Sequence, residues 1–543
     1  MASIIPIQFI IPLVGLFVCY IFFRKPAAAP LPPGPRGLPI VGNIRDLPQP
    51  GQAEYQHWIK FKDAYGPISS VTVAGQTLVL IHDEEAAFNL LERTSLKTSN
   101  RPTQPFAVNH CGFGDFLPVL QYSSRLRQQR KLVHQVLGTA KSVSKFRNVQ
   151  DRESCRFLLR ILNRPDDLMT HTKTEAAAII LSIVYGYSIE ADTVDPLTNL
   201  VHLLMDNFSR AFVPMAWPVD MLPALDYLPE GFPFTSFKGV GRRWKRINEI
   251  VVEAPYQFVR KQMEHGTNRQ SFVSSLVDDL GNPGKNGLSL SKEDEHDIKF
   301  TAAILYGGGA DTTVSTISSF ILAMLMFPDV QKKAQMEIDS VVGLDRLPSF
   351  DDQPRLPYIN ALVKESLRWF PVVPISTPHA TNAEIIYNGY RIPKNSYLLP
   401  SIWWFLHDPN VYKDPSLFDP DRFLEPRNEP DPGAHAFGYG RRICPGRYLA
   451  VESLFITLAR MLAVFTVKKA VDSQGREIEP EFHATPGLVS HPGNFSFNIS
   501  PRSEKHARLV RAVETEHPWD ASDSKLLDSN LIKESISLSR ERS

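Results

Sequence analysis

Cysteine is scarce in this chain, with four residues among 543. They stand at positions 19, 111, 155 and 444, far apart and without the CxxC spacing of zinc sites. This usage argues against a disulfide framework and fits a reducing compartment. An excess of charge is missing too, because 59 Lys and Arg against 58 Asp and Glu leave a net charge of +1. Nucleic acid is therefore not an expected partner.

A long apolar run stands at the N-terminus. Residues 4–23 carry no charge, and twenty such residues span roughly 30 Å as a helix, about one bilayer core. Arg24 and Lys25 follow at once, which by the positive-inside rule predicts a single-pass anchor with the rest of the chain in the cytosol. A cleaved signal peptide is the alternative, but its basic residues would precede the apolar run. The proline-rich residues 30–39 then predict a stiff hinge within 24–45.

The most informative stretch is 437–446, Phe-Gly-Tyr-Gly-Arg-Arg-Ile-Cys-Pro-Gly. Its spacing is explained if Cys444 is a thiolate bound to haem iron, since backbone N–H groups around such a sulfur tune its charge. Phe437 can pack beside the sulfur, Arg442 can meet a haem propionate, and Gly440 and Gly446 allow close approach to the flat macrocycle. The alternative is an ordinary buried cysteine beside a glycine-rich turn. The four spaced partners favour the ligand.

A second unusual stretch lies in the predicted long helix 297–327. Residues 307–309 are three glycines, which together cost roughly 3 kcal/mol inside a helix. Clearance for a flat ligand would explain that cost, whereas a glycine bend with chance polar neighbours is the alternative. Asp311 and Thr312 follow directly, and the Thr312 hydroxyl can bond within the helical ladder.

The 437–446 signature resembles the haem-binding loop of the cytochrome P450 family, and the proline-rich hinge is similar to that of its microsomal members. The resemblance implies that Asp311 and Thr312 are an acid–alcohol pair that relays protons during catalysis. It also implies that Arg130 and His379 meet the propionates of haem b. Leu126 stands where the family usually has tryptophan, four residues before that arginine.

Glu365 and Arg368 form a Glu-x-x-Arg pair on one face of a predicted helix at 360–370, and Arg422 follows at the distance that the family shows. The resemblance implies a buried structural lock made by these three residues, with Asp421 in place of the commoner glutamate.

The implied fold is mainly α with small β-sheets, the triangular prism of cytochromes P450, in one catalytic domain at 46–502. Residues 503–543 are polar and mixed in charge, which predicts a disordered tail. Aromatic and basic residues alternate between Phe232 and Trp244, which suits either a membrane interface or a loop that caps the core.

The resemblance implies a monooxygenase that hydroxylates or epoxidises an apolar small molecule, most like fungal enzymes of secondary metabolism. An NADPH–cytochrome P450 reductase in the endoplasmic reticulum membrane would supply electrons. Basic residues near the cysteine loop could steer its acidic surface, namely Arg441 and Arg447 with Arg127 or Lys131 from the earlier helix. A reductase-independent isomerase or dehydratase and a non-catalytic haem-binding protein are the alternatives.

Overall fold

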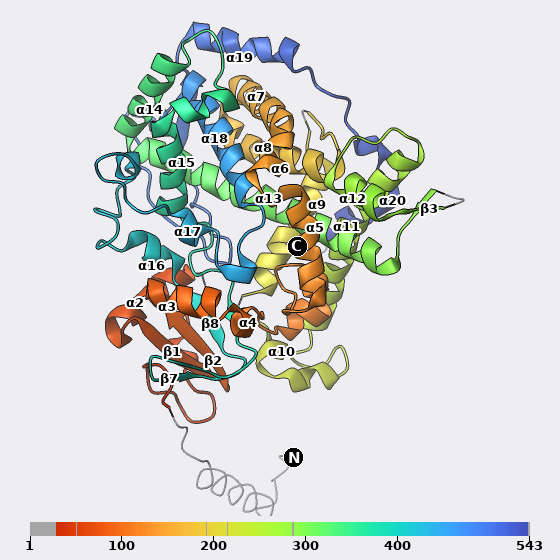
Figure 1. The fold of residues 1–543 in the computed structure, drawn as a ribbon, viewed down its shortest axis with the longest axis vertical. Coiled ribbons are helices and arrows are strands. Elements are labelled where there is room, and N and C mark those ends of the chain that lie inside the picture. Colours follow the sequence, from red (N-terminus) through yellow and green to blue (C-terminus); the bar gives the residue numbers. More distant parts are fainter. Residues whose placement is uncertain (1–28, 50, 192, 214–215, 285–286, 541–543) are drawn as a thin grey trace, which may run out of the picture.

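The computed structural model describes residues 29–540, apart from 50, 192, 214–215 and 285–286. Helices make up most of the molecule, and the main sheet lies at one edge (Figure 1). The predicted class, mainly α with small β-sheets, is confirmed. The predicted anchor at 4–23 lies outside the described residues.

The α-helices follow one another along the chain as α2 (Glu54–Tyr65), α3 (Glu84–Phe88), α4 (Ser95–Thr98), α5 (Ser124–Leu137), α6 (Ala140–Val143), α7 (Arg147–Asn163), α8 (Leu168–Tyr185), α9 (Pro196–Ala211), α10 (Pro218–Met221), α11 (Phe237–Glu264), α12 (Phe272–Leu280), α13 (Lys292–Met326), α14 (Pro328–Val341), α15 (Pro357–Trp369), α16 (Ile402–His407), α17 (Gly433–Ala436), α18 (Arg447–Val464), α19 (Glu504–Glu516) and α20 (Ser529–Arg540). The strands are β1 (Ile68–Val73), β2 (Gln76–Ile81), β3 (Asn282–Gly284), β4 (Gly287–Ser289), β5 (His379–Ala380), β6 (Ile385–Tyr387), β7 (Tyr390–Ile392), β8 (Tyr397–Pro400), β9 (Phe465–Lys469) and β10 (Phe497–Pro501).

Helix α13 runs through the middle of the molecule. Among the described helices it alone is long and apolar enough to cross a bilayer, but 72% of that stretch is buried inside the protein, which makes it a core helix. Residues from Ile298 to Ala310 belong to one hydrophobic core, and residues from Ile317 to Leu325 belong to another. Asp311, Thr312 and Thr313 lie between the two cores and are only half-buried. These three residues therefore form a short, polar and half-buried segment in the middle of an apolar helix.

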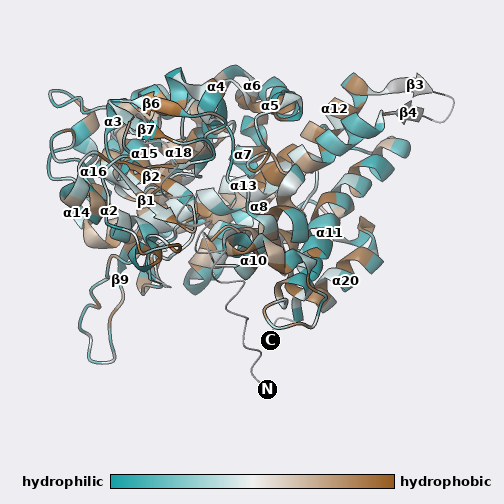
Figure 2. Cartoon of the chain, turned by 90° about the horizontal axis from the view of Figure 1, so that it is seen from below, coloured by the Kyte–Doolittle hydropathy of each residue, from teal (hydrophilic) through white to brown (hydrophobic). Residues whose placement is uncertain are grey.

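The main sheet has the strand order β1-β2-β8-β5. Its first hairpin pairs Ile68 with Ile81 and turns at Ala74 and Gly75, both with positive φ. That conformation is typical of a two-residue β-hairpin turn. The sheet and α2 lie on one side of the molecule, and α11, α12 and α20 lie on the other, with α13 and α8 between them (Figure 2).

The prediction of a disordered tail from residue 503 is wrong, because α19 and α20 follow. Ala507, Val510 and Val513 form a buried stripe at helical spacing, and α19 packs on α7 with it. Helix α20 packs on α11, where Arg246 donates to both carboxylate oxygens of Glu534. The average composition of residues 503–543 is polar and does not reveal this apolar stripe. Burial of the stripe stabilises α19 relative to a disordered chain.

The aromatic residues between 232 and 244 divide into two groups. Phe237 and Trp244 are 1% and 3% exposed and lie on the buried face of α11 itself, so for them a core helix replaces the predicted capping loop. Phe232 and Phe234 are 55% and 74% exposed in the preceding loop. Of these four aromatic rings, those of Phe232 and Phe234 are the exposed ones.

Candidate functional site

Cys444 lies in the turn that leads into α18. Its own N–H donates to the carbonyl of Phe437 at 2.8 Å, which closes the turn. Burial raises the pKa of the Cys444 thiol, while the backbone N–H groups of Gly446 and Arg447, together with the Arg130 and Arg447 guanidiniums, lower it. The sulfur therefore already faces the donors and positive charge that stabilise a thiolate.

The two glycines of the cysteine turn, Gly440 and Gly446, have different surroundings. Gly440 has φ +52°, and a Cβ there would meet the carbonyl oxygen of Leu91 at 2.5 Å. Its close approach is therefore to the backbone of this chain, which corrects the interpretation from sequence. A Cβ at Gly446 would come no closer than 3.9 Å to any neighbour, and that neighbour is the sulfur of Cys444.

Three guanidiniums gather beside this loop. Arg442 donates to the carbonyl of Ser99 at 2.8 Å, Arg130 donates to that of Ile443 at 3.0 Å, and Arg101 donates to that of Thr377 at 2.7 Å. In the part of the chain that the structure describes, none of the three pairs with a carboxylate.

Burial is the main cause that lowers the pKa of all three guanidiniums, that of Arg442 to about 9, and a neighbouring arginine lowers each of them further. For Arg130 the sulfur of Cys444 opposes this lowering. Arg101 and Arg442 are buried and Arg130 is half-buried, and cations in such positions without an anion are costly, because a buried charge needs a partner. The two propionates of haem are a fitting pair of anions. The residues present therefore fit the cofactor.

Arg101 is a site residue that sequence reasoning missed. It stands in a loop far from the other motifs in the sequence, and its hydrogen bonds to Thr377 and Pro378 bring it beside His379. A lone arginine before a proline offers no periodic or motif signal. Only the pairing of Asn100 with Ala380 across the sheet edge places it here.

His379 is buried and interacts with the carbonyl of Thr98 through Nδ1 at 2.9 Å. A carbonyl only accepts, so Nδ1 carries the proton and Nε2 of the neutral ring is an acceptor. Burial, and then Arg101, lower the pKa of His379 well below its usual value. The ring would donate to a propionate only when protonated, a form that a nearby anion favours.

The α13 glycines do not share one role. A Cβ at Gly307 would meet Met205 at 3.0 Å, and one at Gly309 would meet Ile180 at 2.9 Å, so both serve helix packing. Only at Gly308 would a Cβ meet nothing within 4 Å. One glycine of the three therefore borders open space, and clearance for a flat ligand stays a prediction for Gly308 alone. Thr312 donates to the Gly308 carbonyl at 2.8 Å, as the ladder argument predicts.

The predicted lock forms behind the loop. Glu365 accepts from Arg368 at 2.7 and 2.8 Å and from Arg422 at 3.1 Å, and all three side chains are 0% exposed. Asp421 instead pairs with Lys333 at the surface. Helix α15 contacts α17, which directly precedes the cysteine turn, so the lock supports that turn from behind.

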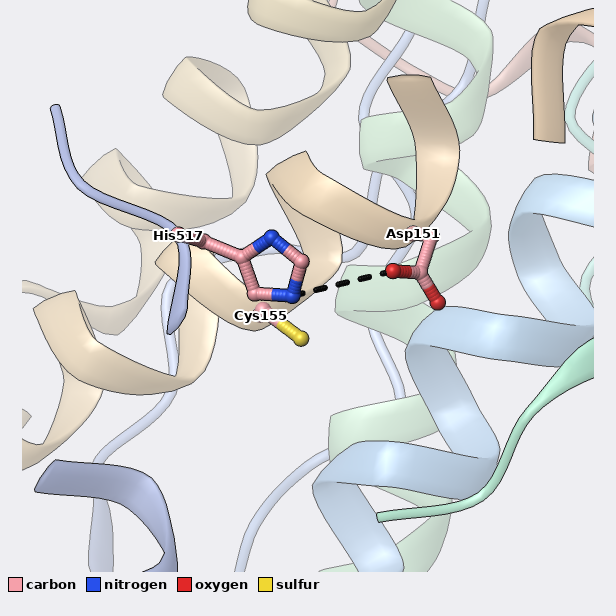
Figure 3. A group of neighbouring side chains, drawn as sticks. All are labelled: Asp151, Cys155 and His517. Atoms are coloured by element: carbon pink, nitrogen blue, oxygen red, sulfur yellow. Dashed lines mark ion pairs between the residues drawn. The ribbon is translucent and has the colours of Figure 1, made fainter. Parts of the chain in front are cut away.

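Another group of ligand-type side chains lies away from this site, formed by Asp151 and Cys155 of α7 with His517 (Figure 3). Arg460 donates to the Cys155 sulfur at 3.1 Å and pairs with Asp151. Burial raises the pKa of Cys155 to about 11. A neutral thiol that accepts from a guanidinium is a poor metal ligand. We therefore interpret this group as a structural contact between α7, α18 and the end of α19.

Comparison with known proteins gives concordant matches. The family model "Cytochrome P450" matches residues 32–499. "Cytochrome P450 monooxygenase CLM2" of Gibberella zeae is 52% identical over 524 residues, which cover 96% of this chain and 99% of that protein. "Multifunctional cytochrome P450 monooxygenase af510" of Aspergillus fumigatus is 49% identical over 92% and 94% of the two chains. "O-methylsterigmatocystin oxidoreductase" of Aspergillus flavus is 38% identical over 94% and 96%.

Proposed function

Because this chain belongs to the cytochrome P450 family, we propose which of its residues carry the haem-thiolate monooxygenase reaction. The enzyme inserts one oxygen atom of O2 into a small molecule and takes electrons from a redox partner. Bound haem supplies the oxygen-activating chemistry, and a thiolate ligand favours cleavage of the O–O bond.

Cys444 would be the iron ligand. The observation that supports this assignment best is the closed turn around Cys444, where Arg130 donates to the carbonyl of the adjacent Ile443 and lowers the pKa of the thiol. Arg101, Arg130 and Arg442 would hold the propionates, and His379 would join them when protonated. Phe437 would pack at the edge of the cysteine turn that its carbonyl closes.

Asp311 and Thr312 would manage protons. One oxygen atom leaves as water, and this requires two electrons and two protons. Thr312 donates its hydroxyl proton to the Gly308 carbonyl, so its oxygen is free to accept from a water molecule. Asp311, one residue earlier and 23% exposed, can pass protons inward from outside the core.

We propose an NADPH–cytochrome P450 reductase as the electron donor and the face around the cysteine turn as its docking surface. The guanidiniums of Arg127 and Arg441 both lie over the ring of Tyr122, at 5.8 and 5.4 Å from its centroid, and both residues are exposed. Lys131 adds a further exposed cation. Such a patch would attract an acidic partner.

We place the enzyme in the endoplasmic reticulum membrane, with residues 1–23 as a single-pass anchor, 24–45 as a hinge and 46–502 as a cytosolic catalytic domain. Side chains from two regions support a membrane contact. Tyr227 and Phe234 are 91% and 74% exposed before α11, and Ile40 is 87% exposed in the hinge. Exposed apolar residues of this kind suit a bilayer interface. The substrate class that we propose is an apolar secondary metabolite or precursor, as the name of the Aspergillus flavus relative suggests.

The test is Thr312→Ala in the haem-loaded full-length enzyme with its reductase. The probe is the compound that gives the largest Soret shift in a screen of apolar molecules. General acid–base groups contribute about 10²–10⁴-fold, so product per NADPH should fall substantially while NADPH consumption persists and hydrogen peroxide accumulates. Thr174→Ala is the control, because Thr174 donates to Thr170 with the same spacing on α8. An unchanged ratio in Thr312→Ala would contradict the proposed relay.

A further inference from the structure

Asp311 has an ion-pair partner from a distant part of the chain. Nε2 of His491 lies 3.3 Å from Oδ1 of Asp311. The His491 side chain is 31% exposed and that of Asp311 is 23% exposed. The histidine therefore has access to water while its ring nitrogen is within reach of the carboxylate for direct proton exchange.

The backbone around His491 is held firmly in this place. Ser315, one helical turn after Asp311, donates to the carbonyl of Ser490 at 2.6 Å. The N–H of Ser490 donates to the carbonyl of Val372 at 2.8 Å. His491 and Thr485 close the loop, since each donates its N–H to the other at 2.9 and 2.8 Å. The same helix that carries Asp311 thus also fixes the loop that carries His491.

The charged surroundings favour this one pairing. His202 of α9 faces the pair, and burial, then Lys173 of α8, lower its pKa, with a further lowering from His491 and a rise from Asp311. His202 is therefore a neutral neighbour near pH 7. Glu54 of α2 accepts from the N–H of Gly487 at 3.2 Å, on the other side of the loop. Of these groups, His491 is the one that lies at ion-pair distance from Asp311.

We propose that His491 is a positioning residue that holds Asp311 and replenishes its protons. The inference rests on the proposed role of Asp311. When the Asp311 carboxyl gives its proton to water beside Thr312, the protonated Nε2 of His491 transfers a proton to Oδ1. The neutral imidazole then takes a proton from solvent water, so charge and protons balance over each cycle.

The experiment measures product and hydrogen peroxide per NADPH with the same Soret-selected probe, from about pH 6 to about pH 8, where histidine changes charge. In the wild type the product ratio should decline as pH rises. In His491→Gln the product ratio should be low at every pH and should hardly change with pH. The decrease relative to the wild type should be less than about 10²-fold, the smallest effect typical of a direct general acid. His483→Gln, a histidine in the same segment, is the control and should behave as the wild type.

A second readout does not depend on turnover. Melting temperatures of the full-length ferric protein should be non-additive for His491→Gln and Asp311→Asn at pH 6 and additive at pH 8, because only the protonated ring forms the ion pair. Lysine keeps its positive charge over this pH range and does not release its proton. The melting temperatures of His491→Lys and Asp311→Asn should therefore stay non-additive at both pH values, while the product ratio of His491→Lys should stay low. Restoration by His491→Lys, or additivity at pH 6, would overturn the proposal.

The two levels of failure are distinguishable. If Asp311→Asn leaves the product ratio unchanged, the proposed relay fails, and this inference fails with it. If Asp311→Asn lowers the ratio and His491→Gln does not, only the role of His491 is refuted.

Discussion

Replacing Glu365 by glutamine tests how the fold holds the cysteine turn. The carboxylate accepts three hydrogen bonds from Arg368 and Arg422 within 3.1 Å, and none of the three side chains is exposed. Glutamine has nearly the same shape but no charge, and its amide NH2 faces guanidinium donors. With its amide oxygen at the Oε1 position, glutamine loses the charge-assisted hydrogen bond from Arg368 Nε to Oε2, which is worth about 1.5–3 kcal/mol. The substitution also removes the negative charge beside buried Arg368, and breaking a buried pair typically costs about 3–5 kcal/mol, so we expect a loss of about 3 kcal/mol.

The assay is urea unfolding of the full-length protein in detergent, followed by circular dichroism. Glu504→Gln is the matched control, since Glu504 pairs with Arg511 at 2.8 Å on an exposed face of α19. The control should leave the unfolding midpoint unchanged. A loss below about 1 kcal/mol for Glu365→Gln would refute the argument that this carboxylate neutralises two buried cations.

Three further outcomes are expected. In Cys444→Ser the ferrous–carbon monoxide Soret band should lose its thiolate red shift, because a neutral hydroxyl donates less charge; a retained shift would exclude Cys444 as the ligand. Arg101→Gln should lose haem faster to apomyoglobin, because one of three guanidiniums without a carboxylate partner is removed; an unchanged rate would place Arg101 outside the cofactor site. Deleting residues 2–24 should weaken membrane attachment in a flotation assay and leave haem binding intact; secretion of the full-length protein with a cleaved N-terminus would contradict the anchor.

Local patterns in the sequence determined much of this protein. The spacing around Cys444, the Glu365–Arg368 pair and the central helix are interactions between near neighbours, so a short stretch encodes them. The hairpin at 68–81 is encoded in the same way, since its turn needs positive φ at two adjacent residues. The back-bond from Thr312 to Gly308 also lies within one helical turn.

Only the tertiary structure decided which distant residues meet. Arg101 and His491 join the site across about 280 and 180 residues of chain, and the glycines at 307 and 309 receive side chains from α9 and α8. The tail was misjudged for a related reason. Its mean composition is polar, yet the stripe from Ala507 to Val513 becomes stable when α7 covers it. Burial depends on the partner surface, and the partner is set by packing of the whole chain.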